Sequence, residues 1–157
     1  MLSDLSVRRG TGVMVMANDR VIVRNNRIDG NPTSAVMVIT YPLKFTDKTY
    51  NPAPRTVVVG ENRFGRNGYD PQIDGGALLV EAFGGALPPV LWDGIGAPGA
   101  TLAAAPGVRA WSLNLAAQGA DPASAKPTPV VLPAPQVQLA VRMPTGAPAE
   151  LEARLVR

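Results

Sequence analysis

The sequence predicts an all-β chain, a right-handed parallel β-helix of two to three coils followed by an extended tail rich in proline and alanine. Three observations predict this fold. Strand-sized apolar runs recur along the chain, and asparagine-bearing turns recur at the same place in each copy. The 16 glycines and 16 prolines favour turns and extended chain over helices.

The repeat sets residues 21–31 above residues 57–67. Each copy is a short apolar run, a turn, a second run and a turn that contains asparagine. The matched positions are Val21 and Val57, Val23 and Val59, Asn26 and Asn62, Ile28 and Phe64, and Asn31 and Asn67. A shorter upstream run, residues 13–15, matches residues 36–38 and, more loosely, residues 78–80.

Alternation along each strand explains why the copies must stack. Val21, Val23 and Ile28 share one side of the chain, while Arg24 and Arg27 share the other. A single copy cannot bury its apolar side. Copies stacked about 4.8 Å apart place valine on valine and close a core.

The asparagines favour the same stacking. We expect Asn26 and Asn62 to form a structural ladder, in which each side-chain amide bonds backbone groups and the next amide. Polar backbone atoms that the bends would otherwise bury are then satisfied. The alternative is that two polar turns match by coincidence within an ordinary β-sandwich.

Three stretches, residues 10–31, 50–71 and 88–94, resemble an exported bacterial family of parallel β-helix repeat proteins that has no assigned activity. Members generally carry secretion or lipoprotein signals. The resemblance therefore implies a periplasmic or extracellular location for the full-length protein. The family's earlier coils and export signal are absent from this sequence, which suggests the C-terminal part of a longer protein or a shortened relative.

The chain divides into two parts on this interpretation. Residues 1–99 form the coils and a C-terminal cap, with a long excursion at 41–55, a third partial coil at 75–83 and the cap at 84–99. Residues 100–157 form an extended, partly mobile tail with two short strands, in 108–115 and 136–143.

Composition excludes several classes of function. The net charge is +3 and its arginines are scattered, so no nucleic-acid footprint is present. No apolar run is long enough to span a membrane, and residues 1–10 lack the apolar region of a signal peptide. The sequence has neither histidine nor cysteine, which removes the commonest general base and thiolate metal sites. We expect no cofactor.

Asp70 and Asp74, near Arg66 and Tyr69, form the best candidate carboxylate pair. Two carboxylates can divide acid and base roles, or help to hold a hard cation such as calcium. The competing interpretation is that each aspartate stabilises a local turn through its own backbone. We favour the turns.

Candidate binding residues lie at two places. The excursion carries aromatic rings beside cations that could stack on sugars or anionic glycans: Tyr41, Lys44, Phe45, Lys48 and Tyr50. The alternative is that these rings hold the loop against the coils. Arg27 above Arg63 could attract acidic saccharides or phosphate, but such a pair is more often a solvated face.

One apolar stack points outward. Met14, Met37 and Leu79 are predicted on the outer face of one sheet, and Ile22 over Val58 on that of another. Strands that are apolar on both faces are normally covered on both. We expect the tail segment 136–143 to cover this face, rather than a separate partner protein.

The function that these observations favour is a non-catalytic structural or binding module, with a glycan or a partner protein as its ligand. The alternative is a fragment of a polysaccharide lyase or epimerase that acts on uronates, an argument from fold analogy alone. We expect no turnover of polyuronates. Self-association through the open N-terminal rung is also predicted, because unpaired strand edges recruit partner strands.

Overall fold

The computed structural model describes residues 9–41, 46–73, 75–115 and 126–135. This part of the chain is mostly β-strand, with parallel sheets and one helix, α1 (Gly76–Ala82). The first sheet has the order β1 (Thr11–Val15), β4 (Ser34–Val38), β7 (Val90–Trp92), β9 (Ala110–Ser112) and β10 (Thr128–Val130). The second has β2 (Asp19–Val23), β5 (Arg55–Val59) and β8 (Leu102–Ala104). The third has β3 (Arg27–Ile28) and β6 (Arg63–Phe64).

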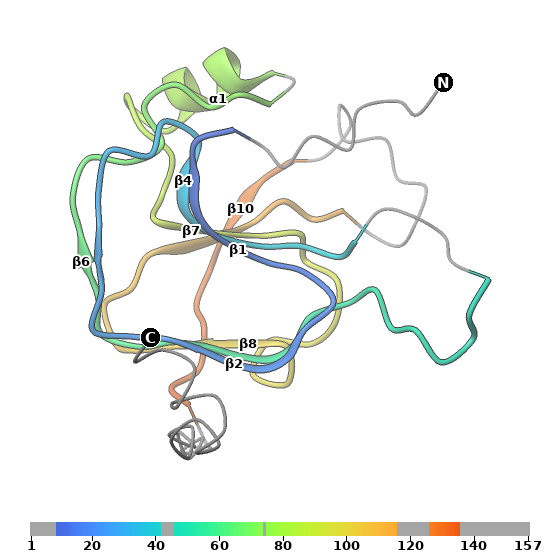
Figure 1. Ribbon diagram of the computed structural model, residues 1–157. Helices are drawn as coiled ribbons and strands as arrows, with labels where there is room; N and C mark the ends of the chain where they lie inside the picture. The colour runs from blue at the N-terminus through green and yellow to red at the C-terminus, as the bar shows by residue number, and fades with distance from the viewer. Residues whose placement is uncertain (1–8, 42–45, 74, 116–125, 136–157) are drawn as a thin grey trace, which may run out of the picture.

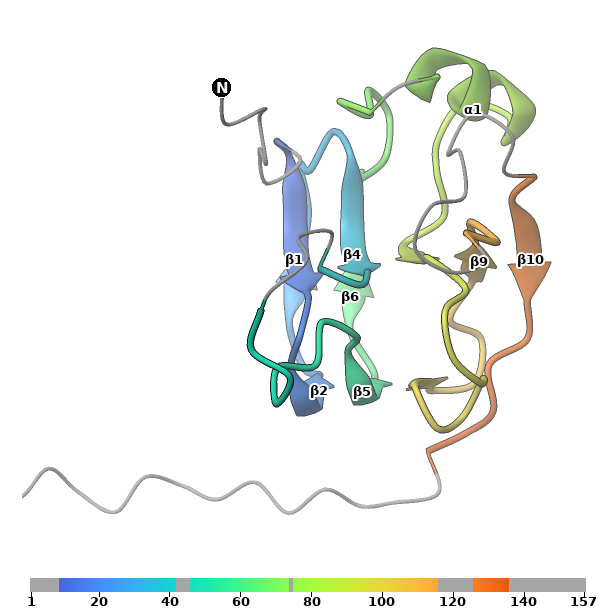
Figure 2. The ribbon, with the colours of Figure 1, turned by 90° about the vertical axis from the view of Figure 1, so that its right-hand side faces the viewer.

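The chain visits these sheets in turn and then returns to the first (Figure 1). We call each passage a circuit: β1, β2 and β3 form the first, β4, β5 and β6 the second, and β7 and β8 begin the third. Successive circuits lie side by side from the N-terminal to the C-terminal end of the stack (Figure 2). The predicted all-β class with parallel strands is confirmed.

The observed register is the one that the repeat predicts. Val21 pairs with Val57 and Val23 with Val59 in parallel strands, and Ile28 pairs with Phe64. The second sheet carries the stack one circuit further, with Leu102 beside Val57 and Ala104 beside Val59. The inward side chains of all three circuits form one core. Its buried members include Val15, Val23, Ile28, Val36, Val38, Val57, Val59, Val90, Trp92 and Leu102.

Asn26 and Asn62 form the predicted hydrogen-bonded pair. The N–H and Nδ2 of Asn26 donate to Asn62 Oδ1 at 3.1 and 3.0 Å. Asn62 Nδ2 donates to the carbonyls of Val23 and Gly60, each at 2.9 Å. The amide of Asn62 therefore joins both circuits and satisfies the backbone at the bend that follows the second sheet.

Asn31 and Asn67 repeat this arrangement at the next bend. The N–H and Nδ2 of Asn31 donate to Asn67 Oδ1 at 3.2 and 2.8 Å. Asn67 Nδ2 donates to the carbonyls of Ile28 and Gly65 at 2.9 and 3.1 Å. Asn67 is 8% exposed, so this second pair is the more deeply buried of the two.

The third circuit begins later than the sequence indicated. The repeat predicts a strand at residues 78–80, but these residues lie in α1, whose alanine, leucine and glutamate are good helix formers. Their place in the first sheet is taken by β7, where Val90 pairs with Val36 and Trp92 with Val38. The expected cap at 84–99 therefore supplies a core strand.

The C-terminal end of the stack is covered by residues that sequence analysis assigned to the extended tail. Strands β8 and β9, within residues 100–157, continue the first two sheets instead of following them. Strand β10 then pairs antiparallel with β9, and Ala104 N–H donates to Pro133 C=O. Val130 and Leu132 pack on the core, and β10 lies beside β9 at this end of the stack (Figure 2). The proline-rich segment thus seals two sheet edges.

At the N-terminal end, β1 and β2 are edge strands among the described residues. Residues 1–8 lie outside that part of the chain. Self-association through this end stays a prediction.

The outer apolar stack exists, with one change of member. Met14 pairs with Met37, Met37 with Leu91, and Leu91 with Trp111 across four strands of the first sheet. Leu79 is not in this stack, because it lies on α1 and packs over it. The helix covers this face of the sheet (Figure 1). The tail segment 136–143, expected as the cover, lies outside the described residues.

We predict that the asparagines at the two bends contribute measurably to stability. Asn62→Leu and Asn67→Leu should each lower the free energy of unfolding by about 1–3 kcal/mol, because bent backbone loses its buried partner. Urea unfolding measures this loss. Asn18→Leu is the matched control, since Asn18 is exposed and precedes β2. Unchanged stability in both ladder variants would contradict a structural role for the amides.

We also predict that α1 is held by an aromatic contact. The rings of Phe83 and Trp111 meet edge to face, with centroids 4.2 Å apart. A double-mutant cycle with Phe83→Leu and Trp111→Leu should give a coupling energy of about 0.5–1.5 kcal/mol. Leu78→Ala should be nearly neutral, because Leu78 is 72% exposed on the same helix. Strictly additive effects would contradict the contact.

Candidate functional site

A groove opens where the third sheet lacks a third strand. In the first circuit residues 24–33 connect β2 to β4, whereas in the third circuit only residues 105–109 connect β8 to β9. The shorter connection cannot follow the wall that β3 and β6 form. In Figure 1 its yellow-orange trace runs inside the blue and green traces of the first two circuits.

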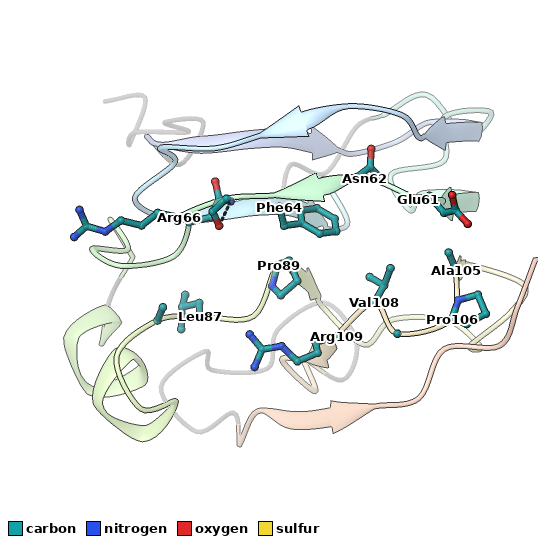
Figure 3. A pocket seen from close by; sticks show the side chains of 14 residues that line it. Glu61, Asn62, Phe64, Arg66, Leu87, Pro89, Ala105, Pro106, Val108 and Arg109 are labelled. Carbon is teal, nitrogen blue, oxygen red and sulfur yellow. Dashed lines mark hydrogen bonds between the residues drawn. The ribbon is translucent and has the colours of Figure 1, made fainter.

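The resulting cavity has a volume of about 550 Å³, within the range of ligand pockets. Phe64 faces Pro89 and Val108 across it (Figure 3). Phe64 and Val108 are half-buried and pack against the core, so the floor of the groove is apolar.

One wall of the groove is the open edge of β6. The N–H groups of Arg63 and Gly65 donate to the carbonyls of Asn26 and Ile28, toward the first circuit. In a parallel strand the alternate residues direct their backbone groups the opposite way. Asn62 and Phe64 therefore aim their N–H and C=O groups toward the groove. Within the described residues, no strand pairs with this edge.

The opposite wall cannot complete the sheet itself. It contains Pro89 and Pro106, and proline has no backbone N–H to donate. Counting on from the Val59–Ala104 pair, Gly107 is the residue that corresponds to Asn62. The asparagine ladder has no side chain to continue it there.

The two ends of the groove differ in charge. Glu61 lies at the end near Pro106, the Arg66 side chain extends outward from the opposite end, and Arg109 lies near Pro89, between the two (Figure 3). All three charged side chains are exposed. Arg66 also lies over the ring of Tyr69, 4.2 Å from its centroid, and this cation–π contact fixes its direction.

Asp29, a residue of the first circuit, accepts hydrogen bonds at the arginine end of the groove. Its carboxylate accepts from the Arg27 side chain at 3.1 Å and from the backbone N–H of Arg66 at 2.8 Å. These hydrogen bonds, that of Arg27 first, lower the pKa of Asp29 below its ordinary value of 3.8. A Cβ on Gly65 would collide with this carboxylate, so glycine permits the close approach.

The predicted arginine pair lies next to these hydrogen bonds. Arg27 and Arg63 stand side by side in the third sheet, as the alignment indicated, and both are exposed. Arg27 is engaged by Asp29. Neither arginine lines the groove. The groove uses Arg66 and Arg109 instead.

The aromatic excursion is described only in part. Tyr41 and Tyr50 meet edge to face with centroids 6.4 Å apart, and Lys48 is exposed nearby in the sequence. Lys44 and Phe45 lie outside the described residues. The ring contact supports the interpretation in which the aromatic residues order the loop, while sugar binding there stays a prediction.

The carboxylate pair is likewise incomplete. Asp70 is exposed, and its backbone N–H donates to Pro32 C=O while its C=O accepts from Gln72. Asp74 lies outside the described residues. Among the residues that the structure describes, no three carboxylates gather as metal ligands.

Sequence reasoning missed the groove, although one signal was available. The third copy of the repeat has glycine where the first two have asparagine, and its connection to the next strand is short. Both features depend on knowing that residues 102–112 form a circuit, which no obvious match to the first two copies reveals.

Comparison of the chain with protein-family models, with curated proteins and with solved structures gives no match. Within the described residues, no helix is long and apolar enough to cross a membrane.

We predict a pH-dependent contribution from Asp29. Because its folded-state pKa is depressed, its contribution to stability is present above 3.8 and is lost as pH falls through the lower folded value. Asp29→Ala should therefore be less stable than wild type at neutral pH, and the difference should shrink in acid. Paired urea titrations measure it. A difference that stays constant with pH would contradict the carboxylate's role.

Proposed function

We propose that this chain is a non-catalytic binding module built as a right-handed parallel β-helix, and that the groove beside β6 is its binding site. The β-helix assignment is supported by the repeated passage through three sheets and by the two asparagine pairs. The observation that carries the binding role is the groove itself, an apolar floor with an open strand edge and charged ends.

A binding role suits these residues better than catalysis. The groove presents two arginines and one glutamate, with no histidine anywhere in the chain to transfer protons near neutral pH. Its arginines would hold an anionic group, and its apolar floor would exclude water from the contact. The proposal extends to a location outside the cytoplasm, as the family resemblance implies.

The binding proposal predicts that filling the groove abolishes binding. Ala86 is exposed and lines the groove, so Ala86→Trp should obstruct it without disturbing the core. Ala82→Trp, on the exposed part of α1, is the matched control. The probes are oligogalacturonate, alginate oligomers, dextran oligomers and extended peptides.

Backbone amide shifts in NMR spectra give the readout. At least one probe should move the amides of Phe64, Arg66 and Arg109 in wild type and in the control, but not in Ala86→Trp. If no probe moves them, or if the obstructed variant binds equally well, the groove is not a binding site.

We also predict that the chain does not degrade polyuronates. Incubation with pectate or alginate should yield no unsaturated products, because neither histidine nor a described carboxylate cluster is present to abstract a proton. The absorbance of unsaturated ends is the measurement. Products that disappear in Asp70→Asn or Asp74→Asn would instead establish a lyase.

A further inference from the structure

We infer that the ligand of this groove is an extended peptide strand of a partner protein, which pairs with the free edge of β6 as a third strand of the third sheet. This inference rests on the proposed binding function and names the class of its ligand. It follows from the backbone at the groove, from the side-chain stack beneath it and from the charges at its ends.

The backbone of β6 is prepared for such pairing. Asn62 and Phe64, two residues apart, direct donors and acceptors into the groove at the spacing that a neighbouring strand matches. A saccharide can use isolated donors, but it has no regular series of alternating N–H and C=O groups. Addition of a strand to a sheet edge supplies that series.

Neighbouring structure keeps this edge open. In the first two sheets the third circuit pairs with the second, for example through Val59 and Ala104. At the third sheet the short connection, residues 105–109, runs inside the path of the first two circuits (Figure 1). Space for one further strand therefore remains between the open edge of β6 and the opposite wall, which includes two prolines.

The stack in the third sheet specifies one side chain of the peptide. Ile28 is buried and pairs with Phe64, whose half-buried ring forms the floor of the groove. A strand in the next position would place a side chain over Phe64, between Pro89 and Val108 (Figure 3). That side chain should be apolar, because stacked inward positions share one core.

The charged ends specify its flanks. Arg66, with Arg109 between it and the middle of the groove, favours an acidic side chain toward one end of the peptide, and Glu61 favours a basic one at the other. The ends lie on either side of the apolar position. An apolar residue between charges of opposite sign is thus the recognised pattern.

The test is selection from a random library of peptides of about seven residues, a length typical of one strand. Peptides are selected on the wild-type chain, and those that also bind Ala86→Trp are discarded. We expect an apolar residue with an acidic residue near it. Arg66→Gln with Arg109→Gln should remove the preference for the acid, whereas Arg24→Gln, an exposed arginine of the first circuit, should not.

Backbone pairing is tested on the selected peptides. Two forms of each peptide are made, one methylated at the odd-numbered nitrogens and one at the even-numbered nitrogens. Only one of these sets can donate to β6, so one of the two forms should bind at least about tenfold more weakly. The amides of Asn62 and Phe64 should gain protection from hydrogen exchange when the unmethylated peptide binds. Equal affinity of both methylated forms would overturn the inference.

The remaining outcomes separate the two proposals. Oligogalacturonate that binds the groove, with no groove-dependent peptide selected, overturns the peptide strand and leaves the binding module intact. Failure of every saccharide probe and of every peptide to bind the groove overturns both.

Discussion

Register between successive circuits is the constraint on which this structure depends. The strands are two to five residues long, and none could persist alone. Each is stabilised because Val21 and Val23 meet Val57 and Val59 in parallel pairs that bury one side of both strands. A shift of one residue in one strand would break these pairs and set an inward valine of one circuit beside an outward side chain of the next. The asparagines at the bends reinforce the same register, since their amides reach the next circuit only when the strands align.

The groove is a consequence of this stacking and of its interruption. Two circuits follow the same wall through β3 and β6, and the third takes a shorter path. Where the path shortens, no further strand pairs with β6 among the described residues, and the residue that corresponds to Asn62 is Gly107, which has no side chain. The residues that end the repeat thereby create both an open strand edge and the space beside it.

The exposed parts of the sheets are protected in some places and not in others. At the C-terminal end, β10 and Pro133 cover β9 and β8, and the prolines there offer no donors to a further strand. On the outer face, α1 shields a stack of methionine, leucine and tryptophan side chains. The edge of β6 has neither form of protection within the described residues. Open edges are usually blunted in natural sheets, and this one is where the proposed partner strand would pair.

The sequence by itself determined the all-β class, the parallel register of the first two circuits and the Asn26–Asn62 pair. Each of these features depends on a match between residues of similar side-chain volume and polarity in the two copies of the repeat. Such a match can be seen in the sequence itself. It misplaced the third circuit, because residues 78–80 and 90–92 are similarly apolar and only packing distinguishes a covering helix from a core strand. It also missed the groove. Arg66 and Arg109 lie far apart in the sequence, and the tertiary structure alone decided that a short connection would set them on one cavity.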